Sequence, residues 1–151
     1  MVMRTRHRPP EVEVWVLLFR LYNTLFRHIQ AYLSRFNLTA PQYAVLRHLG
    51  ERGNLKASEL TVLLEVTAGN LTGILDRMEA MGLLTRQRDL QDRRNWILQL
   101  TPAGRELYEQ AVPSTRAFID ELLQGLAPEE LERANLLLER LLRDLGSKEA
   151  A

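Results

Sequence analysis

Four arginines stand close together in one short segment of the chain. Arg86 and Arg88 precede Arg93 and Arg94, and Asp92 lies directly before the second pair. Planar guanidinium groups bind phosphate oxygens bidentately, and an arginine on an exposed loop can enter the narrow, strongly negative minor groove of A·T-rich DNA. A carboxylate that faced phosphate would repel it, so we interpret Asp92 as an internal partner that orients an arginine. A solvated charged turn is the alternative interpretation.

A second group of candidate residues is mostly small and polar and begins a predicted helix. In a major groove, Asn70 could pair with adenine, Thr72 with a base or a phosphate, and Ala68 could contact a thymine methyl group. Arg77, two turns further on, would reach the DNA backbone. The alternative is that Thr67 only caps the helix and that Asn70 is a solvated surface amide. The whole group is Thr67, Ala68, Gly69, Asn70, Thr72 and Arg77.

The spacing of apolar residues predicts the helices that position these groups. Apolar residues recur at helical spacing from Glu11 to Phe36, which predicts one long helix. Thr39 and Gln42 have the spacing of a capping box, which opens a second helix that ends near 50–53. A short helix over 57–64 and a longer one from Thr67 to Gly82 then have the outline of a helix-turn-helix, whose second helix enters the major groove of DNA.

After Gly82 the apolar period changes to short extended runs. Residues 83–88 and 96–100 predict a two-stranded hairpin with 89–95 as its charged tip. Thr101 and Pro102 open a further helix, in which Pro113 predicts a kink, and Pro128 opens the last one. In that last helix the apolar residues suited to packing on another helix are Leu131, Ala134, Leu138, Leu141 and Leu145.

The expected fold is mainly α, of the α+β winged-helix kind. We expect a single domain over 1–151, with a winged helix-turn-helix at 38–101 and flanking helices at 10–36 and 102–146. The flanking helices carry more apolar surface than the small central unit could cover, which predicts that they form a homodimer. A monomeric helical bundle that covers its own apolar stripes is the alternative.

Composition excludes several classes of function. The 151 residues include no cysteine, which excludes disulfides, thiolate zinc sites, iron–sulfur clusters and thiol-based redox sensing. His7, His28 and His48 lack metal-ligand spacing, and we expect no metal and no cofactor. The sequence has no nucleophile elbow and no glycine-rich phosphate loop, and its acidic residues lie in predicted amphipathic helices. We therefore do not expect this protein to be an enzyme.

Charge is distributed unevenly along the chain. Residues 1–104 contain 14 Lys and Arg against 9 Asp and Glu, whereas residues 105–151 contain 6 against 10. Such separation suggests that the first region binds a polyanion. Because no apolar run is long enough for a membrane span and no signal-peptide pattern is present, we expect a soluble cytoplasmic protein that does not bind a membrane.

From about Leu38 to Gly104 the sequence resembles the multiple antibiotic resistance regulator (MarR) family. The resemblance rests on the stretches LTAPQYAVL, ASEL, DRMEAMGLLTR and DLQDRRNWILQLTPAG. The last is the most specific, because it joins wing tip, strand and helix cap at fixed spacing. The resemblance implies a homodimeric DNA-binding transcriptional regulator on a pseudo-palindromic operator, usually a repressor released by a small ligand. It also implies that Arg94 enters the minor groove and that Asp92 orients it.

A chain without cysteine does not fit the family's thiol-based peroxide and quinone sensors, so an effector, where one exists, would be a small organic molecule. The resemblance implies a pocket between the dimer helices and the winged unit. Its candidate residues also fit ordinary core or interface positions, and they are Trp15, Tyr22, His28, Tyr43 and Arg47. A winged helix that docks a protein without binding an operator is the alternative function.

Overall fold

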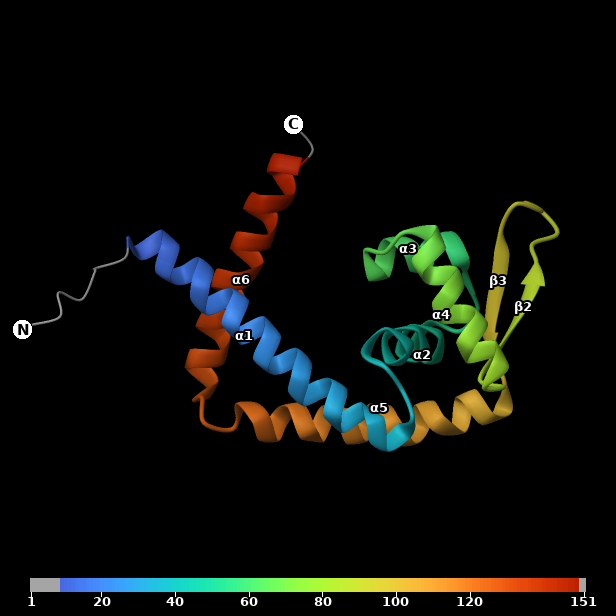
Figure 1. The fold of residues 1–151 in the computed structure, drawn as a ribbon, viewed down its shortest axis with the longest axis horizontal. Helices are drawn as coiled ribbons and strands as arrows, with labels where there is room; N and C mark the ends of the chain where they lie inside the picture. Colours follow the sequence, from blue (N-terminus) through green and yellow to red (C-terminus); the bar gives the residue numbers. More distant parts are fainter. Residues whose placement is uncertain (1–8, 150–151) are drawn as a thin grey trace, which may run out of the picture. The chain divides into compact units, whose positions relative to one another are not determined.

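The computed structural model describes residues 9–149, with the side chains of residues 9–146 (Figure 1). His7 lies outside the described residues. The chain has two compact units, Met1–Pro113 and Ser114–Ala151. The boundary falls inside a helix, directly after the proline for which a kink is expected, and both the kink and the single-domain organisation stay predictions.

Most of the elements belong to the first unit, and their order agrees with the predicted one. The long first helix α1 (Pro10–Leu33) is followed by the 3-10 turn η1 (Ser34–Phe36) and by α2 (Ala40–Arg52). The helix-turn-helix consists of α3 (Ala57–Leu64) and α4 (Ala68–Ala80). The strands are β1 (Leu55–Lys56), β2 (Leu84–Arg88) and β3 (Trp96–Leu100), and the remaining helices are α5 (Pro102–Leu123) and α6 (Pro128–Glu149).

The predicted capping box at the start of α2 is present. The Thr39 hydroxyl accepts a hydrogen bond from the Gln42 backbone N–H at 3.4 Å, and the Thr39 N–H donates to the Gln42 side-chain oxygen at 2.9 Å. Two of the amides that a helix start leaves unpaired are thereby satisfied. Asn37, with a φ of 56°, provides the left-handed residue that ends the preceding turn.

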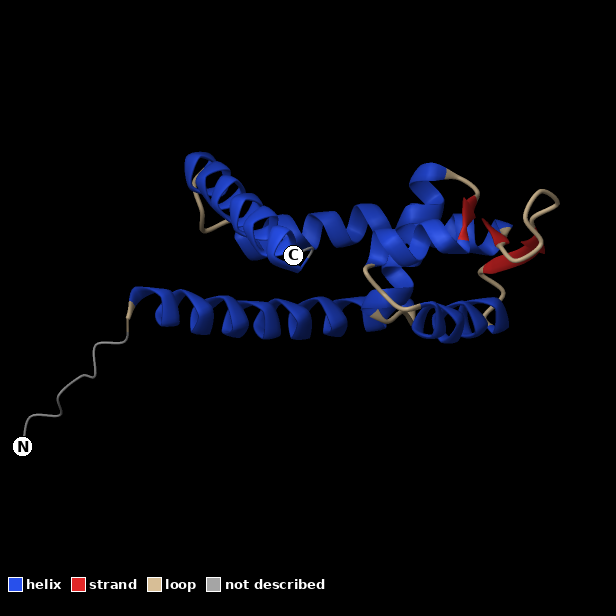
Figure 2. Ribbon diagram, turned by 90° about the horizontal axis from the view of Figure 1, so that it is seen from above, coloured by secondary structure: helices blue, strands red, loops and turns tan. Residues whose placement is uncertain are grey.

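The predicted hairpin is part of a three-stranded antiparallel sheet with the order β1-β3-β2. Strands β2 and β3 pair along their whole length, from Leu84 opposite Leu100 to Arg88 opposite Trp96. The third strand was not predicted. It has only two residues, too few to display an alternating pattern, and it forms because Leu55 pairs with Leu98. Figure 2 shows the strands, in red, at one end of the helix-turn-helix.

The core of the first unit lies where α2, α3, α4 and the sheet meet. Leu46, Leu60, Leu71 and Leu98 are each at most 1% exposed and belong to one apolar cluster. Burying side chains of this kind stabilises the fold by about 1.5–3 kcal/mol each. Helix α4 and the hairpin therefore pack on the same apolar cluster.

The start of α5 is anchored against the beginning of the hairpin. Thr101 caps the helix by accepting the Gly104 N–H at 3.0 Å, and its own N–H donates to the Leu83 carbonyl oxygen at 3.0 Å. A Cβ atom on Gly104 would overlap that carbonyl oxygen. This close approach explains why the segment needs a glycine three residues after the threonine.

Large apolar side chains are exposed on α1 and, in the second unit, on α6. Trp15 is 69% exposed and Tyr22 64%, while on α6 Leu137 is 67% and Leu142 71% exposed. Of the residues expected to form a helix-packing seam, Leu138 and Leu145 are exposed, and Leu131, Ala134 and Leu141 are half-buried. Within residues 9–149, no helix is long and apolar enough to span a membrane.

Candidate nucleic-acid interface

The first turns of α4 present small and polar side chains to solvent. Leu71, Leu75 and Met78 fix the opposite face of the helix in the core. The Thr67 hydroxyl accepts the Asn70 N–H at 3.2 Å and so caps the helix. Five of the candidate residues predicted for this helix are exposed on the outward face, and they are Thr67, Ala68, Gly69, Asn70 and Thr72.

Two of the exposed candidates on α4, Thr72 and Arg77, make local hydrogen bonds. The Thr72 hydroxyl donates to the Ala68 carbonyl oxygen at 2.9 Å, and its oxygen can still accept a hydrogen bond. The Arg77 Nε donates to the Gly73 carbonyl oxygen at 3.1 Å, so this guanidinium lies along the helix. The remaining N–H groups of Arg77 are available to a phosphate.

The four arginines of the hairpin divide into two kinds. Arg86 is 22% exposed at its side chain and is held between Glu79 and Asp76 of α4, with its Nη1 at 2.8 Å from the Asp76 carboxylate. Hydrogen bonding to Glu79 is the largest cause of a raised pKa for Arg86. The arginine cluster is expected to bind DNA phosphates, whereas the Arg86 guanidinium is already paired with these two carboxylates within the protein.

The Arg88 guanidinium also makes its contacts within the hairpin. Its guanidinium carbon lies 4.1 Å from the ring centre of Trp96, and its Nη1 donates to the Arg93 carbonyl oxygen at 2.7 Å. A guanidinium over an indole ring is a favourable cation–π contact. Arg88 thereby connects strand β2 with β3 and with the tip of the hairpin.

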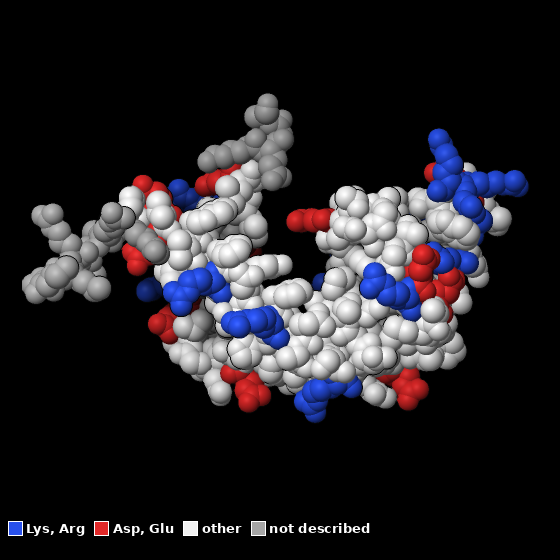
Figure 3. Space-filling model, viewed as in Figure 1, with Lys and Arg blue, Asp and Glu red and all other residues white. Residues whose placement is uncertain are grey.

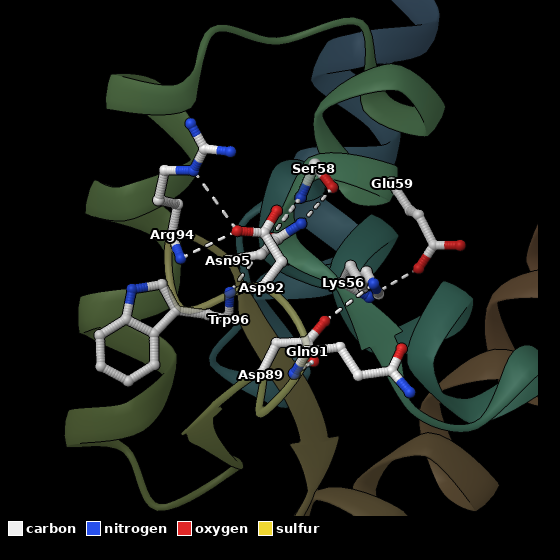
Figure 4. A network of polar contacts seen from close by, with 9 residues as sticks. All are labelled: Lys56, Ser58, Glu59, Asp89, Gln91, Asp92, Arg94, Asn95 and Trp96. Carbon is white, nitrogen blue, oxygen red and sulfur yellow. Dashed lines mark hydrogen bonds and ion pairs between the residues drawn. The ribbon is translucent and has the colours of Figure 1, made fainter.

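The tip itself carries Arg93 and Arg94, both exposed. The Arg94 side chain is 95% exposed, its Nε lies 3.5 Å from the Asp92 carboxylate, and its backbone N–H donates to the same oxygen at 3.1 Å (Figure 4). Asp92 therefore contacts Arg94 in the way that an orienting partner would. Basic side chains gather over the tip of the hairpin in the space-filling view (Figure 3).

Sequence reasoning missed the residues that attach the hairpin tip to α3. Lys56 forms an ion pair with Asp89 at 2.8 Å, and the Asn95 amide nitrogen donates to the Ser58 hydroxyl at 2.7 Å (Figure 4). Both pairs join residues more than 30 positions apart, and no local pattern reports such contacts. A hollow between α3, α4 and the hairpin is lined by Thr61, Thr72, Arg94 and Trp96 among others.

The five candidate ligand-binding residues are distributed over α1 and α2. Trp15 and His28 are 13 positions apart on α1, which corresponds to about 20 Å along a helix axis. His28 is exposed, and Tyr43 is half-buried against the core. Arg47 forms an ion pair with Glu51 at 3.0 Å. At most a subset of the five could therefore line one small pocket.

A helix-turn-helix whose second helix exposes a polar amino-terminal face, followed by an arginine-tipped hairpin, defines the winged helix-turn-helix class. The sequence model of the MarR family matches residues 38–96 of this chain. The organic hydroperoxide resistance transcriptional regulator of Bacillus subtilis is 31% identical over 142 residues, which cover 94% of this chain and 95% of the relative. The chain belongs to the MarR family.

Two solved structures of similar proteins extend this comparison. A mutant MarR from Escherichia coli, crystallised with operator DNA, has a TM-score of 0.79 and 28% identity, and the match covers 87% of this chain and 96% of that one. BpsR from Bordetella bronchiseptica, whose DNA binding is regulated by 6-hydroxynicotinic acid, has a TM-score of 0.77 and 29% identity. That match covers 85% of this chain and 98% of BpsR.

Proposed function

We propose that this protein is a sequence-specific DNA-binding transcriptional regulator that acts as a homodimeric repressor on a pseudo-palindromic operator. The observation that carries the proposal is that one compact unit presents both the exposed start of α4 and, at the hairpin tip, the 95%-exposed Arg94. The first surface suits the major groove, and the second suits the adjacent minor groove.

We assign the DNA contacts to the exposed members of the two groups. Asn70 and Thr72 would read base edges, Arg77 and Arg93 would bind phosphates, and Arg94 would enter the minor groove. Arg86 is left out because it is half-buried and bound to the carboxylates of α4. Arg88 is exposed, but it is left out because its guanidinium stacks on the Trp96 ring and donates to the Arg93 carbonyl oxygen.

The homodimer proposal rests on the exposed apolar faces of α1 and α6. A monomer rarely exposes a continuous series of large apolar side chains, and a second copy of the chain would cover the same series on both partners. Two winged units related by a two-fold axis would then face two half-sites of a palindrome. On α1 the exposed apolar residues are Val12, Val14, Trp15, Leu17, Phe19, Leu21, Tyr22, Leu25 and Phe26.

We further propose that a small organic molecule, of the aromatic acid class, releases the repressor from DNA. BpsR, at 29% identity, responds to a ligand of this class. The relative named for organic hydroperoxide resistance does not guide the choice, because this chain has no cysteine for a thiol reaction. Tyr43 and Arg47 lie one turn apart on α2. In the proposed complex Arg47 would exchange its ion pair with Glu51 for the carboxylate of the ligand, and the aromatic ring of the ligand would pack beside Tyr43.

A selection from random duplexes tests the DNA proposal. Duplexes that the purified protein enriches are labelled with a fluorophore, and binding of the protein to them is followed by fluorescence anisotropy at about 50 and about 200 mM salt. If a dimer neutralises about six phosphates, affinity should fall on the order of a thousandfold across this range. Asn70→Ala should relax base choice at one position of each half-site, whereas Arg52→Ala, an exposed arginine at the end of α2, should bind like the parent.

Failure to enrich any duplex, or binding that ignores salt, would favour a winged helix that docks a protein instead. For the effector, a set of aromatic acids is screened for an increase in thermal unfolding temperature and then for release of the selected duplex. A compound that raises the unfolding temperature must bind the folded state. The effector proposal fails if compounds that stabilise the protein leave its DNA affinity unchanged.

A further inference from the structure

The tip of the hairpin is fastened to the first turn of α3 by a side-chain clamp. The Asn95 Nδ2 donates to the Ser58 Oγ at 2.7 Å, and the Ser58 backbone N–H approaches the Asn95 Oδ1 at 3.4 Å. The two residues are 37 positions apart in the chain. The nitrogen and the oxygen of the Asn95 side-chain amide thus both contact Ser58 at the start of α3 (Figure 4).

Asn95 also closes the loop in which Arg94 lies. Its backbone N–H donates to the Asp92 carbonyl oxygen at 2.8 Å, and its own carbonyl oxygen accepts the Asp89 N–H at 3.2 Å. Its side-chain oxygen accepts the Trp96 N–H at 3.0 Å. Since Asp92 binds the Arg94 backbone on the other side, the backbone of Arg94 is held between two fixed neighbours.

A second attachment holds the opposite end of the same loop. Asp89, with only 6% of its side chain exposed, forms an ion pair with Lys56 at 2.8 Å and accepts the Gln91 N–H at 2.9 Å. Lys56 and Ser58 flank the start of α3, and α3 packs through Leu60 into the core that it shares with α4. Both ends of the hairpin loop are therefore fixed relative to the helix that would read the major groove.

We propose that Ser58 and Asn95 are positioning residues, which hold the backbone of Arg94 at a fixed place relative to the start of α4 and so set the point from which its side chain extends. The inference rests on the proposed DNA-binding function. A loop that is already ordered loses less conformational freedom on binding, and an arginine in fixed register with α4 can enter the minor groove while Asn70 reads the major groove. The clamp therefore sets the spacing between the two parts of a half-site.

The inference predicts non-additive effects on DNA affinity. Ser58→Ala and Asn95→Ala should each weaken binding to the selected duplex by about two- to tenfold, the range expected for one hydrogen bond. In an Arg94→Ala background neither change should weaken binding further, because the group that they position is gone. Gln99→Ala, an exposed amide on the same strand as Trp96, is the matched control and should leave affinity unchanged.

Two further readouts separate positioning from a general structural role. Thermal unfolding temperatures of Ser58→Ala and of the parent should agree, because the clamp is at the surface and the core is untouched. Selection from random duplexes with Asn95→Ala should lose preference at the A·T-rich positions that flank the major-groove contacts, and should keep the bases read by Asn70.

Specific results would overturn the inference. Losses that add to that of Arg94→Ala, or parent-like affinity of both clamp variants while Arg94→Ala binds weakly, would show that the clamp does not position the arginine. Equal losses in both backgrounds with a lowered unfolding temperature would indicate a structural role only. If the parent enriches no duplex, the proposed function fails, and this inference fails with it.

Discussion

Arg86→Ala and Arg94→Ala each remove one arginine side chain from the hairpin. Arg86→Ala should lower the stability of the fold, whereas Arg94→Ala should weaken DNA binding. Arg86 is 22% exposed and bridges Asp76 and Glu79, so its loss leaves two carboxylates of α4 without their counter-charge. For a partly buried bridge of this kind we expect a loss of about 1–2 kcal/mol of unfolding free energy. In a protein of this length that lowers the unfolding temperature by about 3–6 °C.

Arg94 differs because its side chain is 95% exposed and its carboxylate partner Asp92 is half exposed. Exposed ion pairs contribute at most about 1 kcal/mol, so the unfolding temperature of Arg94→Ala should fall by less than about 4 °C. Its DNA affinity should fall instead. A lost arginine contact of about 1–2 kcal/mol per wing, taken over two wings, corresponds to about 30- to 700-fold.

Circular dichroism melting curves and fluorescence anisotropy on the selected duplex, both at the same salt concentration, measure the two effects. Arg86→Ala, assayed well below its unfolding temperature, should keep its affinity within about tenfold, because its guanidinium faces α4 and not the solvent. A variant Arg86→Ala with the stability of the parent but without DNA binding would contradict these assignments. So would a variant Arg94→Ala that unfolded early and bound normally.

Three other predictions follow from the fold. Gly104→Ala should lose about 1–3 kcal/mol of unfolding free energy in urea titrations, because its Cβ would overlap the Leu83 carbonyl oxygen, whereas Gly146→Ala, with open space around it, should not be destabilised. Burial lowers the pKa of His48, so the folded state resists protonation. Stability should therefore fall as pH drops below about 6.5, and it should fall less in His48→Gln. Leu138→Glu, which places a charge in an exposed apolar face of α6, should shift the dimer toward monomer in light-scattering measurements, and an unchanged mass would contradict the proposed interface.

The helices could be predicted from the sequence because their signals are local. The capping box of Thr39 and Gln42 and the cap at Thr67 involve partners three residues apart, and both are present. The exposed face of α4 followed from the same pattern, since its apolar residues identify the buried side. The two-residue strand β1 gave no such signal, because it exists only through its pairing with β3.

Within the hairpin, local sequence alone shows that four arginines lie close together and that Asp92 neighbours Arg94. It could not determine which arginines face the solvent. Arg86 is turned toward Asp76 and Glu79, which belong to another element, and such an assignment depends on how the hairpin lies against α4.

The same distinction holds for the loop that carries Arg94. Composition determined its charge, and local spacing determined its place between two strands. Its attachment to Lys56 and Ser58 is a contact across more than 30 residues of chain, and only the packing of α3 beside the sheet brings those partners within hydrogen-bonding distance. Local patterns report interactions along one element, whereas the position of a side chain relative to a second element is decided by the tertiary structure.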